Sequence, residues 1–256
     1  MTGDPRFLVY YGGEAQDAIR QYGLAVLDPA IKANLARCRG PDSLLLGYLS
    51  LGEVHAGQSY APALARAGLL FEPNPNWPDA RLLDMRSAQW REWVVERLVP
   101  TILARGFDGL FFDTLDNAEA LEQRDPVRFG GMVAGAAALV RAVRQRFAGV
   151  PLMINRGYAV LPQIAGQFDM LLGESVYSTF DAGAKGYRLM PEAGYAWQVE
   201  RLRAARERDR RLRVFSLDYW DPQDRAGLAR IYAVQRANGF VPYVATPDLT
   251  RIVPAP

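Results

Sequence analysis

Short apolar runs alternate with longer amphipathic stretches along almost the whole chain. The runs are rich in β-branched and aromatic residues, and they predict strands at 7–12, 24–28, 44–52, 108–113, 151–155, 169–174, 213–218 and 240–245. The stretches between them have apolar positions at helical spacing, and they predict helices at 14–22, 29–38, 60–67, 87–104, 126–147, 158–166, 192–211 and 222–238. Strands that alternate with helices in this way are typical of a parallel sheet with crossover helices.

The number of these units and the length of the chain predict the architecture. The chain has 256 residues, and a (β/α)8 barrel typically has about 250. We therefore predict an α/β fold with a single (β/α)8 TIM barrel over residues 1–256. The alternative that the same alternation permits is an open, doubly wound sheet.

Local signals place several boundaries. Asp28-Pro29 and Asp221-Pro222 resemble a capping acid followed by proline at the first helical position, so we expect helices to begin there. Residues 53–86 and 175–191 are longer than ordinary connections and lie after predicted strands. Long loops at the carboxyl ends of barrel strands usually shape the substrate site, and we expect the same of these two.

Carboxylates stand at or next to the carboxyl ends of most predicted strands. Asp28, Glu53, Asp113, Glu174 and Asp218 all occupy such positions. A buried strand tolerates a charge poorly, so a repeated acid at the same end of successive strands needs a reason. In a parallel α/β protein that end carries the active site. The pattern predicts an acid-lined site and catalysis by carboxylates.

Composition excludes several kinds of partner. The chain has 30 basic and 28 acidic residues and a net charge of +2, so we expect no nucleic-acid or membrane partner. No uninterrupted apolar run reaches about 18 residues, the length that spans a bilayer. The amino-terminal residues carry no signal-peptide pattern. One cysteine, Cys38, excludes an internal disulfide. We expect a monomer.

The scarce residue types narrow the chemistry. The two lysines, Lys32 and Lys185, do not end predicted strands, which makes Schiff-base and pyridoxal-phosphate chemistry unfavourable. The only histidine is His55, so a site with several histidine ligands is impossible. No phosphate-binding glycine loop or dinucleotide fingerprint occurs. We therefore expect no metal and no cofactor. Asp and Glu remain, and paired carboxylates are the usual equipment for cleaving glycosidic bonds.

The strongest catalytic candidates are Asp113 and Glu174, each of which follows an apolar strand. Glu53 has two interpretations, a substrate contact or a buried salt bridge with Arg86 or Arg156. Asp218 also has two, binding substrate or orienting another group. Aromatic and polar side chains near the strand ends suit a sugar site. The full set of expected substrate-binding residues is Tyr11, Tyr48, Glu53, Asp116, Asn155, Arg156, Tyr158, Tyr177, Asp218, Tyr219 and Trp220.

Seven motifs in order resemble one family. GYLSLGE, LLDMRSAQWREW, GFDGLFFDTLDN, MINRGY, GESVY, SLDYW and GFVPYVAT cover nearly the whole chain. Together they resemble the endo-α-1,4-polygalactosaminidase barrels, which include glycoside hydrolase family 114 and the related hydrolase domain of the Pel exopolysaccharide enzymes. The resemblance implies a TIM barrel that cuts chains of α-1,4-linked galactosamine and N-acetylgalactosamine internally, without a metal. Its catalytic Asp matches Asp113, its catalytic Glu matches Glu174, and its cleft-lining glutamate matches Glu53. It also implies a periplasmic or secreted location.

The leading hypothesis is therefore an endo-acting glycosidase on a cationic, partly deacetylated galactosaminoglycan. Glu174 would act as general acid/base and Asp113 as nucleophile, with retention of configuration. Two alternatives stay open. One is a divalent-metal barrel of the enolase type with Glu53, Asp113 and Asn155 as oxygen ligands. The other is a barrel that binds polysaccharide without cleaving it.

Overall fold

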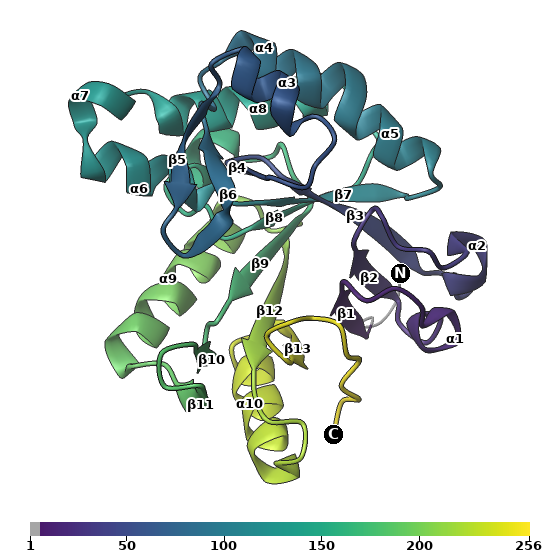
Figure 1. Ribbon diagram of the computed structural model, residues 1–256. Helices are drawn as coiled ribbons and strands as arrows, with labels where there is room; N and C mark the ends of the chain where they lie inside the picture. Colours follow the sequence, from purple (N-terminus) through teal and green to yellow (C-terminus); the bar gives the residue numbers. More distant parts are fainter. Residues whose placement is uncertain (1–5) are drawn as a thin grey trace.

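The computed structural model describes residues 6–256, and eight of its strands form one parallel sheet that curves into a barrel (Figure 1). In hydrogen-bonded order these strands are β1 (Phe7–Tyr10), β2 (Leu24–Leu27), β3 (Leu44–Ser50), β7 (Gly109–Asp113), β8 (Leu152–Asn155), β9 (Met170–Glu174), β12 (Arg213–Tyr219) and β13 (Val241–Ala245). Each lies inside or within one residue of a predicted strand. The predicted (β/α)8 TIM barrel is confirmed.

The first and last strands lie side by side, which excludes the open sheet. The rings of Phe7 in β1 and Tyr243 in β13 have centroids 6.3 Å apart. Just beyond these strands, the backbone N–H of Tyr11 donates to the carbonyl of Leu249 at 2.7 Å. The sheet therefore closes on itself, and the carboxyl ends of all its strands meet at one mouth.

Helices surround the barrel, but several begin later than the sequence indicated. They are α1 (Gln16–Ile19), α2 (Leu35–Cys38), α3 (Ala61–Arg66), α4 (Ala88–Trp93), α5 (Val99–Ala104), α6 (Asp116–Arg124), α7 (Pro126–Phe129), α8 (Met132–Arg146), α9 (Glu192–Arg208) and α10 (Arg225–Ala237). A π-helical turn, η1 (Val94–Leu98), joins α4 to α5 just before Pro100, whose missing N–H interrupts the α-helical bonding. The predicted helix 158–166 is only a 3-10 turn, η2 (Leu161–Ile164).

Both Asp-Pro helix starts are wrong, for one physical reason. Asp28 accepts from the N–H of Ala30 and makes a local turn, and α2 begins only after Asn34, which caps it. Similarly, Asp224 rather than Asp221 caps α10. An aspartate that bonds the backbone two residues ahead favours a turn as readily as a helix start.

The sequence missed α6 and all five short strands in the two long loops. Only Ala118 and Leu121 of α6 are buried, so the helix shows little apolar periodicity. The first loop forms a three-stranded antiparallel sheet of β4 (Glu53–His55), β5 (Leu70–Asn74) and β6 (Trp77–Leu83). The second forms the hairpin of β10 (Ser178–Asp181) and β11 (Gly186–Leu189). Both project from the barrel (Figure 1).

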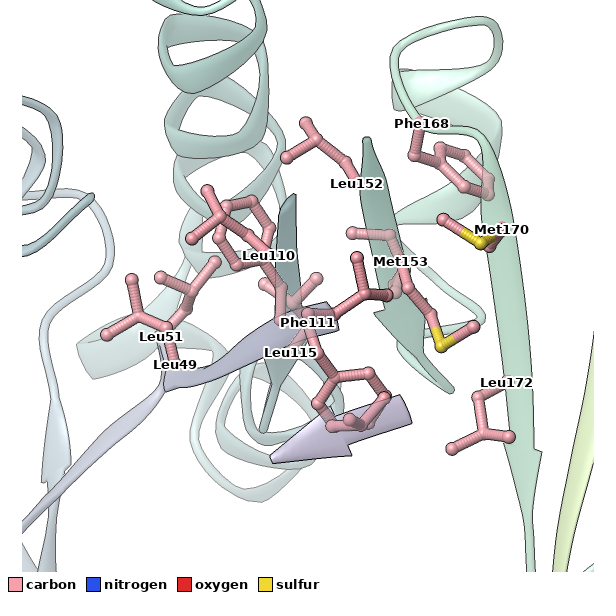
Figure 2. Close-up of a cluster of buried hydrophobic side chains, with 14 of the residues drawn as sticks. Leu49, Leu51, Leu110, Phe111, Leu115, Leu152, Met153, Phe168, Met170 and Leu172 are labelled. Atoms are coloured by element: carbon pink, nitrogen blue, oxygen red, sulfur yellow. The ribbon is translucent and has the colours of Figure 1, made fainter. Parts of the chain in front are cut away.

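Large apolar side chains fill the barrel and the layer under the helices. Phe111, Met153 and Leu172 come from three neighbouring strands and are fully or almost fully buried; Figure 2 shows them among the surrounding core side chains. Successive residues of a strand point to opposite faces. Phe111 and Asp113 therefore share the inner face of β7, and the acid stands at the mouth directly above the packed core.

One helical stretch, Pro126–Arg146, is long and apolar enough to cross a membrane by composition. It consists of α7 and α8, which are separated by Gly130 and Gly131. One side of α8 is buried in the main hydrophobic core through residues such as Ala136 and Val140. This is the amphipathic helix that the sequence indicated, and it covers the barrel.

Candidate active site

Asp113 and Glu174 face a shared donor at the mouth of the barrel. Asp113 ends β7, Asn155 ends β8 and Glu174 ends β9, and these strands are neighbours in the sheet. The Nδ2 of Asn155 donates to Asp113 Oδ1 at 2.8 Å and to Glu174 Oε2 at 2.7 Å. Because one nitrogen contacts both oxygens, those two oxygens lie within about 5.5 Å of each other.

The environment favours one proton on this pair. Burial and the neighbouring charge of Glu174 raise the pKa of Asp113 to about 7, although the hydrogen bond from Asn155 lowers it. Within residues 6–256, no ion pair links either carboxylate to an arginine or lysine. Asp113, buried beside a second acid and without a cationic partner, therefore keeps its proton up to a pH of about 7.

Three tyrosines surround the pair and supply further donors. The hydroxyl of Tyr219 donates to Glu174 Oε1 at 2.5 Å. Tyr11 and Tyr48 have ring centroids 5.2 Å apart, and the charge of Asp113 acts on both. Burial together with the nearby carboxylates holds the pKa of all three phenols well above the ordinary value. The phenols therefore keep their protons and remain hydrogen-bond donors.

The residue after each of these strand ends has a left-handed backbone. Thr114 follows Asp113 with φ of 64°, Arg156 follows Asn155 with φ of 50°, and Ser175 follows Glu174 with φ of 52°. Such a conformation costs a residue other than glycine about 1–2 kcal/mol. Strain of this kind persists only where the surroundings hold it, and it clusters at functional sites. The three sharp turns aim the three preceding side chains at the mouth.

Thr114 also ties two strands together. Its Oγ1 lies 2.8 Å from Ser50 Oγ in β3 and accepts from the N–H of Gly52 at 2.8 Å. Its own N–H donates to Asp113 Oδ1 at 2.8 Å. The turn after β7 is thereby fixed on both sides, and with it the carboxylate of Asp113.

Glu53 is held by amides rather than by an arginine. Its Oε2 accepts from Asn74 Nδ2 in β5 at 2.5 Å and from Asn117 Nδ2 in α6 at 3.1 Å. The two arginines considered for a salt bridge have other partners. Arg86 binds Asp84 at 2.8 Å, and Arg156 faces Asp116 at 3.4 Å. Glu53 therefore joins the projecting sheet to α6 beside the mouth.

Asp116, Arg156 and Tyr158 form the rim near Glu174. Asp116 adds to the negative charge that acts on Asp113. The hydroxyl of Tyr158 donates to Gln198 Oε1 at 2.8 Å, and its ring meets that of Trp197 edge to face at 5.3 Å. Tyr158 also lies within the influence of Glu174 and Arg156, and burial raises its pKa.

Asp218, Tyr177 and Trp220 lie outside this group. Asp218 is fully buried on the outer side of β12, where Gln235 of α10 donates to it at 2.6 Å. Tyr177 and Trp220 pack against the small apolar cluster under α10. Asp218 therefore points away from the mouth and has the geometry of the orienting role that the sequence left open. Tyr177 and Trp220 are half-buried, and their contact with substrate stays a prediction.

Several contributing residues had no signal in the sequence. Gln198 lies in the middle of α9 and donates to the carbonyl of Ser175 at 2.8 Å. Asn74 and Asn117 appear as ordinary loop and helix residues until the fold brings them to Glu53. The one available signal was position: Thr114 and Ser175 each follow an acid that ends an apolar strand.

Among residues 6–256, no group of three or more His, Cys, Asp or Glu side chains lies close enough together to hold a metal ion.

Comparisons with known proteins agree with this geometry. The model of glycoside-hydrolase family GH114 matches residues 5–256. The glycoside hydrolase domain of PelA from Pseudomonas aeruginosa is 26% identical with a TM-score of 0.83, and the match covers 98% of both chains. Aspergillus fumigatus Ega3, solved in complex with galactosamine, has the same fold at 14% identity and a TM-score of 0.70, over 98% of this chain and 95% of that one. An uncharacterized protein of Deinococcus radiodurans is 25% identical over 96% of this chain and 80% of its own length.

Proposed function

The chain belongs to glycoside-hydrolase family GH114, and from this premise we propose that it cleaves internal α-1,4 bonds in a polymer of galactosamine and N-acetylgalactosamine. Asp113 and Glu174 are the catalytic pair in this proposal. The bound galactosamine of Ega3 and the similarity to the PelA glycoside hydrolase domain support the substrate class. The acids at the mouth support it as well, because they attract a chain that carries ammonium groups.

The observation that carries the proposal is the bridge through Asn155. The Asp113 and Glu174 oxygens that accept from Asn155 lie within about 5.5 Å of each other. This distance supports a retaining mechanism, in which the two carboxyl groups lie about 5–5.5 Å apart. An inverting enzyme needs a wider space, of about 6.5–9.5 Å, for water.

The two roles require one ionised and one protonated carboxyl group. We assign the nucleophile to Asp113, which receives hydrogen bonds from Asn155 and from the N–H of Thr114, and the acid/base role to Glu174. The raised pKa of Asp113 opposes this assignment in the free protein, because it keeps the proton on Asp113 up to a pH of about 7. The assignment therefore requires Asp113 to lose its proton when substrate binds, while Asn155 donates to both carboxyl groups.

Defined oligomers test the activity. The protein is incubated with α-1,4-linked galactosamine oligomers and with partly acetylated ones, and products are identified by mass spectrometry, with glucosamine oligomers as the control. We expect internal cleavage of the galactosamine series only. Glu174→Gln and Asp113→Asn should each lose cleavage while keeping the fold. Full activity in both variants would refute the assignment of the pair.

Azide separates the two roles. With an activated α-galactosaminide, a variant that lacks the acid/base residue should release an α-glycosyl azide, and one that lacks the nucleophile should give the β-azide. We expect the α product from Glu174→Ala and the β product from Asp113→Ala. The opposite pattern would exchange the roles and leave the catalytic pair unchanged.

We further propose that residues 1–256 act as one catalytic barrel domain and work as a monomer. The match of the family model over residues 5–256 supports the first statement. A periplasmic or secreted location is proposed from the resemblance to the family, and it fits the proposed exopolysaccharide substrate. Size-exclusion chromatography with light scattering and fractionation of the native host test these points.

A further inference from the structure

The segment that follows Glu174 is held from two sides. It begins with the left-handed Ser175 and leads through Tyr177 into β10. The N–H of Ser175 donates to the carbonyl of Leu217 in β12 at 2.8 Å. Its carbonyl accepts from Gln198 Nε2 in α9, also at 2.8 Å. A strained residue next to Glu174 is thus fixed between a strand and a helix.

Asp218 fixes the next part of the same segment. Its Oδ1 accepts from the backbone N–H groups of Tyr177 at 2.7 Å and Ser178 at 2.8 Å. Its Oδ2 accepts from Gln235 Nε2 at 2.6 Å. The side chain has no exposed surface. Each oxygen of this buried carboxylate therefore has at least one donor, which is the condition for placing a charge in the interior.

Two adjacent residues of β12, Asp218 and Tyr219, contact the segment after Glu174 and Glu174 itself, respectively. Tyr219 points to the mouth and donates to the carboxylate of Glu174. Asp218 points outward and accepts from the backbone N–H groups of the third and fourth residues after Glu174. A movement of the segment therefore moves Glu174 relative to Tyr219 and Asn155. A displacement of about 1 Å at a catalytic group can reduce a rate about 100-fold.

We propose that Asp218, together with Gln198, is a positioning residue that holds the left-handed turn at Ser175 and so keeps Glu174 aligned with Asp113. Asp218 touches neither substrate nor the reacting atoms. The proposal rests on the proposed function for its catalytic consequence, whereas its structural statement concerns only the alignment of the pair.

Three substitutions at two positions of β12 test the inference. Asp218→Asn keeps the oxygen that accepts from the two backbone N–H groups and replaces the oxygen that accepts from Gln235 by an NH2 group, and Asp218→Ala removes both oxygens. Ser216→Ala is the matched control, because Ser216 is equally buried on the same outer face and its hydroxyl has no hydrogen-bond partner. We measure kcat and KM on galactosamine oligomers, the carboxyl titration of Asp113 and Glu174 by carbon-13 NMR, and thermal unfolding.

We expect Asp218→Ala to lower kcat at least about tenfold with KM within about twofold, and to change the titration of the pair. Asp218→Asn should recover most of that loss, and Ser216→Ala should match the unaltered protein. If Asp218→Ala does not fold, Gln198→Met is measured instead. It removes the hydrogen bond from α9 to the carbonyl of Ser175 and should also lower kcat and change the titration of the pair.

Two results would overturn the inference. The first is that Asp218→Ala folds and is less stable, but its kcat and the titration of Asp113 and Glu174 are unchanged. If Asp218→Ala does not fold, the same result for Gln198→Met has the same meaning. The other is an Asp218→Asn protein as impaired as Asp218→Ala. Failure of the proposed function is distinguishable from both. In that case the unaltered protein cleaves no galactosamine polymer, and the NMR titration still shows whether Asp218 aligns the pair.

Discussion

Replacing Asp113 by Asn should make the protein more stable at neutral and alkaline pH while it removes activity. Asp113 is buried beside Glu174, and its pKa is about 7 instead of the ordinary 3.8. The folded protein therefore binds this proton more tightly than the unfolded chain does. The resulting stability is fully present below a pH of about 3.8, and it is lost as pH rises through about 7.

The size of the effect follows from the same shift. Each pKa unit corresponds to 1.36 kcal/mol, so the proton of Asp113 contributes about 4 kcal/mol between those two pH values. Asparagine does not titrate, and it also removes the repulsion with Glu174. Relative to the unaltered protein, Asp113→Asn should gain about 4 kcal/mol between pH 4 and pH 8. For a protein of this size that is about 8–16 °C in Tm.

Thermal unfolding followed by calorimetry from pH 4 to pH 8 measures this difference. Glu96→Gln is the control, since Glu96 is an exposed residue of the helical turn η1. A surface carboxylate of this kind contributes little to stability, so the control should follow the unaltered protein at every pH. If the Tm difference for Asp113→Asn is the same at pH 4 and pH 8, the raised pKa of Asp113 is refuted.

Three further outcomes are expected. Tyr219→Phe loses the donor to Glu174 and should lower kcat about 10- to 100-fold in the oligomer assay, and an unchanged kcat would contradict its role. Gly52→Ala places a Cβ 2.2 Å from the carbonyl oxygen of Thr114 and should cost at least about 2 kcal/mol in denaturant unfolding, whereas Gly13→Ala meets nothing within 4 Å and should be neutral. EDTA should leave cleavage unchanged, and a loss that added divalent metal reverses would favour the enolase-type alternative.

The strands and the end of the barrel that carries the site were predictable because they depend on local patterns. A buried parallel strand needs a continuous apolar run. An acid at the end of such a run can be recognised from the amino-acid sequence, as at Asp113 and Glu174. Helix starts were less predictable. Asp28 and Asp221 have the composition of caps, but their side chains bond backbone N–H groups two residues ahead, and the helices begin later.

Local sequence patterns were enough to locate the eight buried strands and the acids at the ends of β7 and β9. The closure of the sheet into a barrel and the directions in which neighbouring side chains point depend on tertiary packing. Tyr219 and Asp218 are consecutive residues of a strand that is buried on both faces, so no apolar alternation shows which one points to the mouth. The packing of β12 between the barrel interior and α10 sets that direction. As a result, Tyr219 donates to Glu174, and Asp218 accepts from Gln235 and from the backbone N–H of Tyr177.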